Sequence, residues 1–89
     1  MIRYWFEFYE TKDIYSLGLQ LGCGVTAFNK EDAIKIIEET IFIHKELPAI
    51  KKCIENIDMR NLDQGQVVAN MWAPNFRGIW YPIGFHKNE

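Results

Sequence analysis

Residues 17–32, LGLQLGCGVTAFNKED, decide the fold, because a strand pattern passes directly into a helix start within them. Every odd-numbered residue from 17 to 27 is apolar, whereas the even-numbered ones are Gly, Gln or Thr. Such alternation is typical of a β-strand with one buried face and one nearly bare face. We therefore expect a strand over residues 14–28.

The helix that follows is indicated by its first turn. Asn29 is a favourable N-cap residue, and Glu31 and Asp32 come where the helix dipole favours acids. Apolar residues then recur at three- and four-residue spacing, which predicts an amphipathic helix over 30–45. Pro48 fits the first turn of a second amphipathic helix, with its apolar residues again at helical spacing.

Two segments near the ends of the chain show the alternating pattern of a β-strand. Residues 1–10, MIRYWFEFYE, place aromatic and aliphatic side chains on every second position, which predicts a first strand that a polar break over 11–13 joins to the next. Residues 58–75 carry a weak pattern and are expected to be mostly irregular. Residues 76–85 alternate again, and Pro82, which lacks an N–H, predicts an edge strand or a bulge there.

The element order is strand, strand, helix, helix, irregular segment, strand. We expect one α+β domain over residues 1–89, a two-layer sandwich in which a mostly antiparallel sheet of three to four strands carries two helices on one face. A chain of 89 residues has too little length for a second domain.

Composition excludes several classes of function. The chain has 10 basic and 12 acidic residues and a net charge of −2, whereas a nucleic-acid binder needs a basic face. No apolar run approaches the roughly 20 residues of a membrane span, and Glu7 and Glu10 stand where a signal peptide would be apolar. We expect a cytoplasmic protein without nucleic-acid or membrane partners, whose two cysteines, Cys23 and Cys53, are reduced.

The glycine-rich stretch 22–27, GCGVTA, formally matches a dinucleotide-binding motif. A second predicted helix follows where that motif requires a parallel strand, so we favour a strand whose glycines admit close neighbours. Cys23 could be a nucleophile, but it falls on the apolar face, where thiols are usually buried and protonated. The cysteines and histidines lack the short spacings of a metal site, and we expect neither a metal nor another cofactor.

The bare face of the predicted sheet carries Trp5 and Trp80 beside glycines. An aromatic platform on a glycine floor is a place where an extended or flat partner can dock. The alternatives are that the tryptophans merely cover the glycines, or that residues 58–75 fold over them. Tryptophan and arginine are enriched at interface hot spots, which favours a protein partner or a second copy as occupant.

Four strings together resemble a family of small bacterial proteins of uncharacterised function. They are GCGVTAF at 22–28, LPAIKKCIENIDM at 47–59, NLDQGQVVANM at 61–71 and RGIWYP at 77–82, of which the last is the most specific. The likeness spans residues 4–85. The resemblance implies a bacterial cytosolic protein and no established activity.

The sequence thus predicts a non-enzymatic protein that binds a protein partner. Its candidate anchors are Trp5, Trp72, Arg77 and Trp80, and its acidic cluster of Glu31, Asp32, Glu38 and Glu39 could meet a basic surface, as an immunity-type protein meets a toxin. Two other interpretations are a thiol-dependent or small-molecule activity centred on Cys23 and a homodimeric subunit of a larger assembly.

Overall fold

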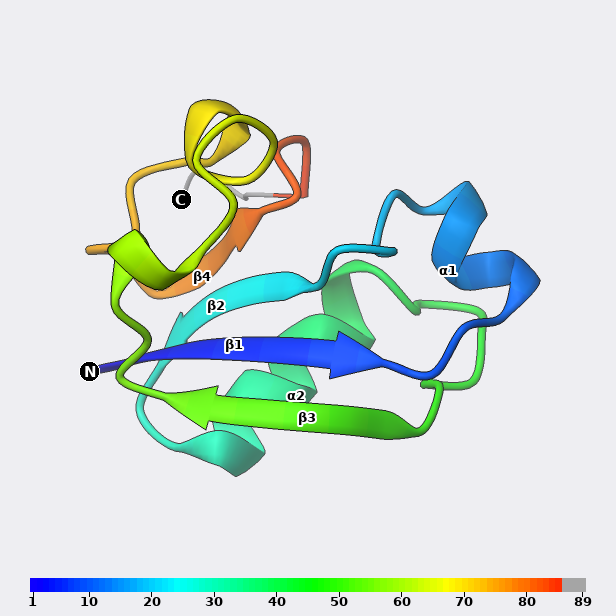
Figure 1. The fold of residues 1–89 in the computed structure, drawn as a ribbon. Helices are drawn as coiled ribbons and strands as arrows, with labels where there is room; N and C mark the ends of the chain where they lie inside the picture. Colours follow the sequence, from blue (N-terminus) through cyan, green and yellow to red (C-terminus); the bar gives the residue numbers. More distant parts are fainter. Residues whose placement is uncertain (86–89) are drawn as a thin grey trace.

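The sheet has four strands in the order β3-β1-β2-β4, and each neighbouring pair is antiparallel. The strands are β1 (Ile2–Phe8), β2 (Cys23–Ala27), β3 (Ile50–Glu55) and β4 (Gly78–Tyr81), and the helices are α1 (Lys12–Ser16) and α2 (Lys30–Thr40). The structure, a computed structural model, describes residues 1–85 of the chain. Figure 1 shows α1 beyond the end of β1 and α2 crossing behind the sheet.

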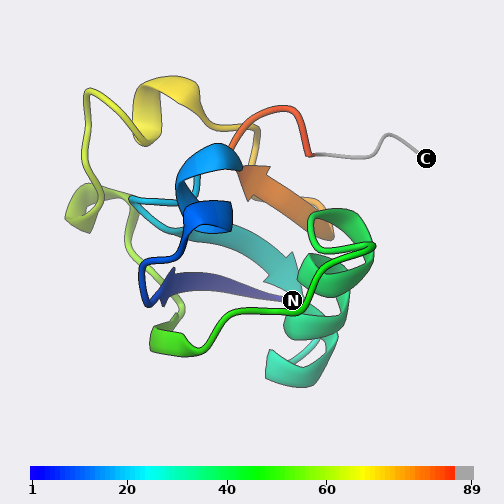
Figure 2. The same cartoon turned by 90° about the vertical axis from the view of Figure 1, so that its right-hand side faces the viewer.

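The α+β class and the antiparallel sheet of four strands confirm the expected fold in outline. The order of elements is β-α-β-α-β-β, not ββααβ, and only α2 covers the sheet, because α1 lies beyond its end. On the face opposite α2 lies the segment 56–72, which we call the covering segment, so both faces are covered (Figure 2). The arrangement therefore differs from a simple two-layer sandwich.

β1 is central and confirms the strand predicted at the N-terminus. Tyr4, Phe6 and Phe8 point to the α2 side, where they belong to the larger core cluster. Trp5 points to the other side and belongs to a second cluster under the covering segment. The predicted division of the faces is correct for Val25 and Ile79, which also lie on the α2 side. It is wrong for Tyr81, which the alternation over 76–85 places with Ile79 and which instead joins Trp80 in the second cluster.

The second predicted strand is wrong over its first half, because residues 12–16 form α1. The Thr11 hydroxyl accepts a hydrogen bond from the Ile14 N–H at 3.2 Å and caps the helix start. Gly18 ends the helix with a φ of 74°, its N–H donating to the Tyr15 carbonyl while the Leu19 N–H donates to the Ile14 carbonyl. These two bonds and the buried Ile14 and Leu19 form a Schellman motif, which ends the helix. The leucines around Gly18 stand at every second position, so the sequence suggests a strand instead.

α2 begins where the sequence predicts and ends earlier. Asn29 caps it, with Oδ1 accepting from the Asp32 N–H at 2.8 Å. The predicted end near residue 45 is wrong, because the chain leaves the helix at Ile41 and buries Phe42. The Phe42 ring meets Phe8 edge-on, with ring centroids 6.2 Å apart, and this contact draws the chain away from the helix axis.

The second predicted helix is wrong, since residues 50–55 form β3. The sequence favours a helix there because its apolar residues recur at three- and four-residue spacing. In the structure both faces of β3 are covered, so Cys53 packs on the α2 side and Ile54 on the other. A bulge at Glu7 and Phe8 shifts the register, which brings Ile50 to the α2 side with Cys53.

The remaining predictions agree with the structure in part, because the strand expected over 76–85 is only Gly78–Tyr81 and ends before Pro82. Residues 58–75 are irregular apart from two 3-10 turns, Met59–Asn61 and Val68–Asn70. β4 lies at an edge of the sheet, as Pro82 predicted, and its pairing with β2 contains a register shift.

Candidate functional site

The predicted platform of Trp5 and Trp80 exists but is closed. Trp5 is 3% exposed and Trp80 is 1% exposed, and the two indoles stack with centroids 5.9 Å apart. The covering segment packs Ile57, Leu62 and Val67 over them. The alternative in which residues 58–75 fold over the tryptophans is therefore the observed one, and neither side chain is available as a surface anchor in this conformation.

Gly24 of β2 and Gly22, the residue before β2, are the close neighbours that the sequence favours. A Cβ on Gly24 would overlap the ring of Trp80, and one on Gly22 would overlap the ring of Trp5. The two indoles therefore lie directly against the backbone of these glycines. No space is left between them for a phosphate or a flat ligand.

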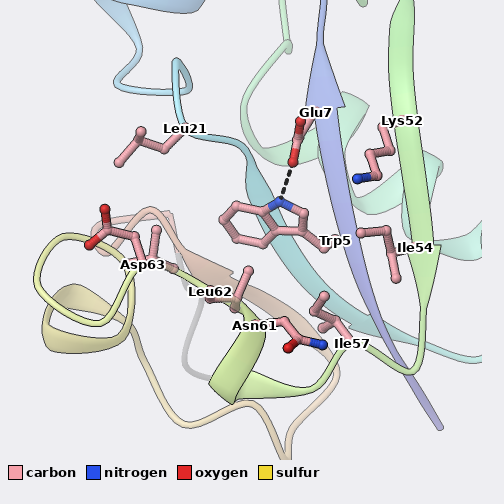
Figure 3. Close-up of a pocket in the computed structure, with 10 residues that line it drawn as sticks. Trp5, Glu7, Leu21, Lys52, Ile54, Ile57, Asn61, Leu62 and Asp63 are labelled. Atoms are coloured by element: carbon pink, nitrogen blue, oxygen red, sulfur yellow. Dashed lines mark hydrogen bonds between the residues drawn. The ribbon is translucent and has the colours of Figure 1, made fainter.

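Beside Trp5 the covering segment leaves a hollow of about 360 Å³ (Figure 3). The Trp5 indole N–H points to Glu7 and donates to its Oε2 at 3.1 Å. Leu21, Ile54 and Leu62 supply apolar walls, and the polar groups around the hollow belong to Glu7, Lys52, Asn61 and Asp63. Among residues 1–85, no three His, Cys, Asp or Glu side chains are grouped as a metal site requires.

Cys23 does not fit a thiol-dependent activity. Its side chain is fully buried on the α2 side, as its position on the apolar face predicted. Burial strongly raises the pKa of the thiol, because the surroundings cannot solvate a thiolate. A protonated and buried sulfur is a poor nucleophile, so the burial of Cys23 argues against a reactive thiol in this conformation.

Arg77 and Asp32 are brought together from 45 residues apart. The Arg77 guanidinium donates through Nη2 to Asp32 Oδ1 at 2.6 Å and through Nε to Oδ2 at 3.0 Å. The Phe28 N–H also donates to Oδ2 at 3.0 Å. The Asp32 carboxylate therefore connects the start of α2 with the residue that precedes β4. The Arg77 bonds, followed by the Phe28 N–H, lower the pKa of the Asp32 carboxyl.

Two exposed phenylalanines belong to the surroundings of this ion pair, one in contact with Arg77 and one next to it in the sequence. The guanidinium carbon of Arg77 lies 5.6 Å from the ring centroid of Phe28, within range of a cation–π contact. Phe28 is 65% exposed and Phe76, the neighbour of Arg77, is 62% exposed. We call Phe28, Phe76 and Arg77 the aromatic corner.

Two hydrogen bonds tie the loop that carries Phe76 and Arg77 to the sheet. The Thr26 hydroxyl donates to the Pro74 carbonyl at 2.6 Å, and the Trp72 N–H donates to the Trp80 carbonyl at 2.7 Å. Trp72 itself is 40% exposed, so of the three predicted tryptophan anchors it alone reaches the surface.

The acidic cluster is divided by the structure. Glu31, Glu38 and Glu39 are exposed on α2, and Glu39 pairs with Lys35 at 3.9 Å. The Asp32 carboxylate instead forms an ion pair with Arg77. Three of the four predicted acids therefore remain on an accessible helix surface.

Sequence reasoning missed the phenylalanines of the corner. Phe76 was assigned to the predicted strand, and Phe28 to the end of the strand before α2. The sequence carries a signal for Phe28 alone, because it breaks the run of Gly, Gln and Thr at the even-numbered positions. In the structure both phenylalanines lie outside the strands β2 and β4.

No family model, curated protein or solved structure matches this chain. No helix within residues 1–85 is both long enough and apolar enough to cross a membrane.

Proposed function

We propose that this protein is a non-enzymatic binding protein that engages a protein partner through the aromatic corner. The carrying observation is that the exposed ring of Phe28 contacts an arginine that Asp32 already holds in place, with the exposed Phe76 next to that arginine in the sequence. Arginine and aromatic residues dominate interface hot spots, and a side chain held before binding loses less conformational entropy on association.

The charge of the adjoining helix indicates the kind of partner. α2 contains four acids and two lysines, and Glu31, Glu38 and Glu39 are exposed on it. A partner with a basic surface would be attracted to this helix and oriented towards the corner. A toxin neutralised by an immunity-type protein fits that description when its surface is basic.

The partner can be identified by site-directed photo-crosslinking in the organism's own cells. A benzoyl-phenylalanine at position 76 should form one dominant covalent adduct, and the same probe at the exposed Ile43 should not. Mass spectrometry of the adduct names the partner, which is then purified. A position-76 probe that gives the same adducts as the position-43 probe contradicts the proposal.

Calorimetry on the purified complex then tests the surface. Phe28→Ala and Arg77→Ala should each weaken the affinity about tenfold or more, as truncation of a hot spot does. Tyr15→Ala, at an exposed residue on α1, is the matched control and should leave the affinity unchanged. Full affinity in a Phe28→Ala/Arg77→Ala double variant would show that the partner binds elsewhere.

A further inference from the structure

The floor of the hollow beside Trp5 is made by two cross-strand pairs. In the antiparallel register, Trp5 of β1 lies opposite Ile54 of β3. Glu7 lies opposite Lys52, and all four of these side chains line the hollow. Residues directly opposite each other in such a pair have Cβ atoms about 4.5–5.5 Å apart. The Glu7 carboxylate and the Lys52 ammonium are therefore neighbours, on the same side of the Trp5 ring (Figure 3).

These two charged groups have hydrogen-bonding capacity that the chain leaves unused. Glu7 Oε2 accepts from the Trp5 indole N–H at 3.1 Å, whereas its Oε1 has no partner within residues 1–85. In the same part of the chain, the Lys52 ammonium makes neither a hydrogen bond nor an ion pair. A carboxylate oxygen accepts hydrogen bonds and an ammonium donates three, so both groups can bind a ligand in the hollow.

The rest of the hollow is mostly apolar. Aliphatic side chains of the sheet, of the loop before β2 and of the covering segment surround the Trp5 ring there: Leu21, Ile54, Ile57, Leu62 and Val67. The volume of about 360 Å³ lies within the range of small-molecule sites. An apolar group of a ligand therefore has a place beside the indole.

The polar residues of the covering segment lie away from Glu7 and Lys52. Asp63 Oδ1 accepts from the N–H groups of Gly65 and Gln66 at 3.0 and 2.8 Å, so this carboxylate holds a turn of the covering segment. Asn61 lies across the Trp5 ring from Glu7 (Figure 3). The charged end of the hollow thus consists of Glu7 and Lys52.

The opposite charges of Glu7 and Lys52 select the class of ligand. A neutral apolar molecule would desolvate both charges without giving either a partner, which costs free energy. A simple cation would be repelled by Lys52, and a simple anion would be repelled by Glu7. A ligand that carries both charges satisfies both groups, and its charges must be adjacent because the two side chains are cross-strand neighbours. An α-amino acid has its ammonium and its carboxylate on the same carbon.

We propose that the hollow beside Trp5 binds a free α-amino acid with a large apolar side chain. The ammonium of the ligand donates to Glu7 Oε1, and its carboxylate accepts from Lys52. Its side chain lies against the Trp5 ring, between the sheet and the covering segment.

This small-molecule site is independent of the aromatic corner. Phe28, Phe76 and Arg77 do not line the hollow. A failure to bind amino acids therefore leaves the protein-partner proposal standing, and loss of the partner leaves amino-acid binding measurable in the same protein.

Protein NMR with L-leucine and L-phenylalanine tests the proposal. Each amino acid should shift the Trp5 indole N–H resonance saturably, with a Kd of about 1 mM or lower. L-Leucinamide lacks the carboxylate and N-acetyl-L-leucine lacks the ammonium. Each of these blocked derivatives should bind roughly tenfold more weakly than L-leucine, because each leaves one charge of the hollow unpaired and meets the other with a like charge.

Two neutral variants separate ligand recognition from folding. Glu7→Gln keeps an oxygen that accepts from the Trp5 N–H and loses the negative charge, so N-acetyl-L-leucine should then bind as well as L-leucine. Lys52→Gln loses the positive charge, so L-leucinamide should then bind as well as L-leucine. A purely structural effect would instead weaken the binding of all three compounds alike.

Matched controls remove one charge at positions outside the hollow. Lys51→Gln and Glu46→Gln change exposed residues that do not line it, and both variants should keep the preference for L-leucine over its blocked derivatives. The proposal is overturned if neither amino acid shifts the Trp5 resonance at tens of millimolar. It is also overturned if the blocked derivatives bind the unmodified protein as tightly as L-leucine, or if Glu7→Gln and Lys52→Gln leave the preference unchanged.

Discussion

Asp32 is the residue at which the sheet, the helix start and the aromatic corner meet. Its carboxylate accepts from Arg77 and from the Phe28 N–H, and both interactions favour the charged form. Since Arg77 is partly exposed, we expect the pair to contribute at most about 1 kcal/mol to the free energy of unfolding. Its main effect is to hold the guanidinium beside Phe28.

The pH dependence of this pair follows from the lowered pKa of Asp32. A carboxyl whose pKa is lower in the folded state contributes stability above its unfolded pKa of about 3.9. That contribution is lost as the pH falls through the folded value. We predict that an NMR titration of the Asp32 carboxyl has its midpoint below 3.9, and that Arg77→Leu moves the midpoint upward.

Lys45→Ala is the control for that titration, because it removes the Asp13 ion pair and leaves Asp32 untouched. An unchanged midpoint in Arg77→Leu would show that Arg77 does not hold the carboxylate in solution. The sequence could nominate Asp32 and Arg77 separately, as an acid of α2 and a candidate anchor. It could not pair them, because 45 residues separate them and only the β2–β4 register brings them together.

At the scale of elements, the contact between β2 and β4 depends on a missing side chain. Gly24 has no Cβ, so the Trp80 ring lies directly against its backbone. We predict that Gly24→Ala lowers the free energy of unfolding by about 1–3 kcal/mol, as overpacking of a dense core does. Urea denaturation followed by circular dichroism measures the loss.

Gly65→Ala is the comparison for this substitution. The nearest atom to a Cβ there is Asp63 Oδ1 at 3.7 Å, an ordinary contact distance, so the change should be small. Equal stability of the Gly24 and Gly65 variants would mean that Trp80 moves aside at little cost.

The sequence predicted correctly the elements whose pattern comes from local contacts or from one core on each face. β1 alternates cleanly because each face meets one core, and α2 begins at a cap that is complete within four residues. β3 was misassigned because Cys53 and Ile54 are adjacent apolar residues that enter different cores. α1 was misassigned because its stop signal, Gly18, lies among leucines whose spacing also suits a strand.

At the scale of the whole molecule, two unlike layers protect a thin sheet. α2 covers one face, and the covering segment, which has only short 3-10 turns, covers the other. The sequence divides the two faces correctly for β1, for β2 and for Ile79 and Trp80, but not for Tyr81. It could not show that an irregular segment closes the second face, since that segment carries no periodicity and is held by contacts with distant strands.

The two cysteines report on how the whole molecule opens. Cys23 is buried at the centre, whereas Cys53 lies partly exposed in the edge strand. We predict that a maleimide reagent labels Cys53 in the native protein and labels Cys23 only when the domain unfolds. Mass spectrometry of digested protein, sampled over time and at rising urea, assigns each label to its site.

Cys53→Ser serves as the control, because any native labelling that remains must come from Cys23. Rapid labelling of Cys23 without urea would mean that the α2 layer opens separately from the sheet. Labelling of Cys23 that follows the urea transition would confirm that the core unfolds as a unit.

The stacked pair of Trp5 and Trp80 gives the protein a built-in optical signal. Two indoles held 5.9 Å apart at an interplanar angle of 30° are close enough for their electronic transitions to couple. Such coupling produces a paired positive and negative band in the circular dichroism spectrum, which a lone tryptophan does not show. Because the covering segment packs on both indoles, circular dichroism can follow whether a partner, a variant or a change of solvent lifts that layer from the sheet.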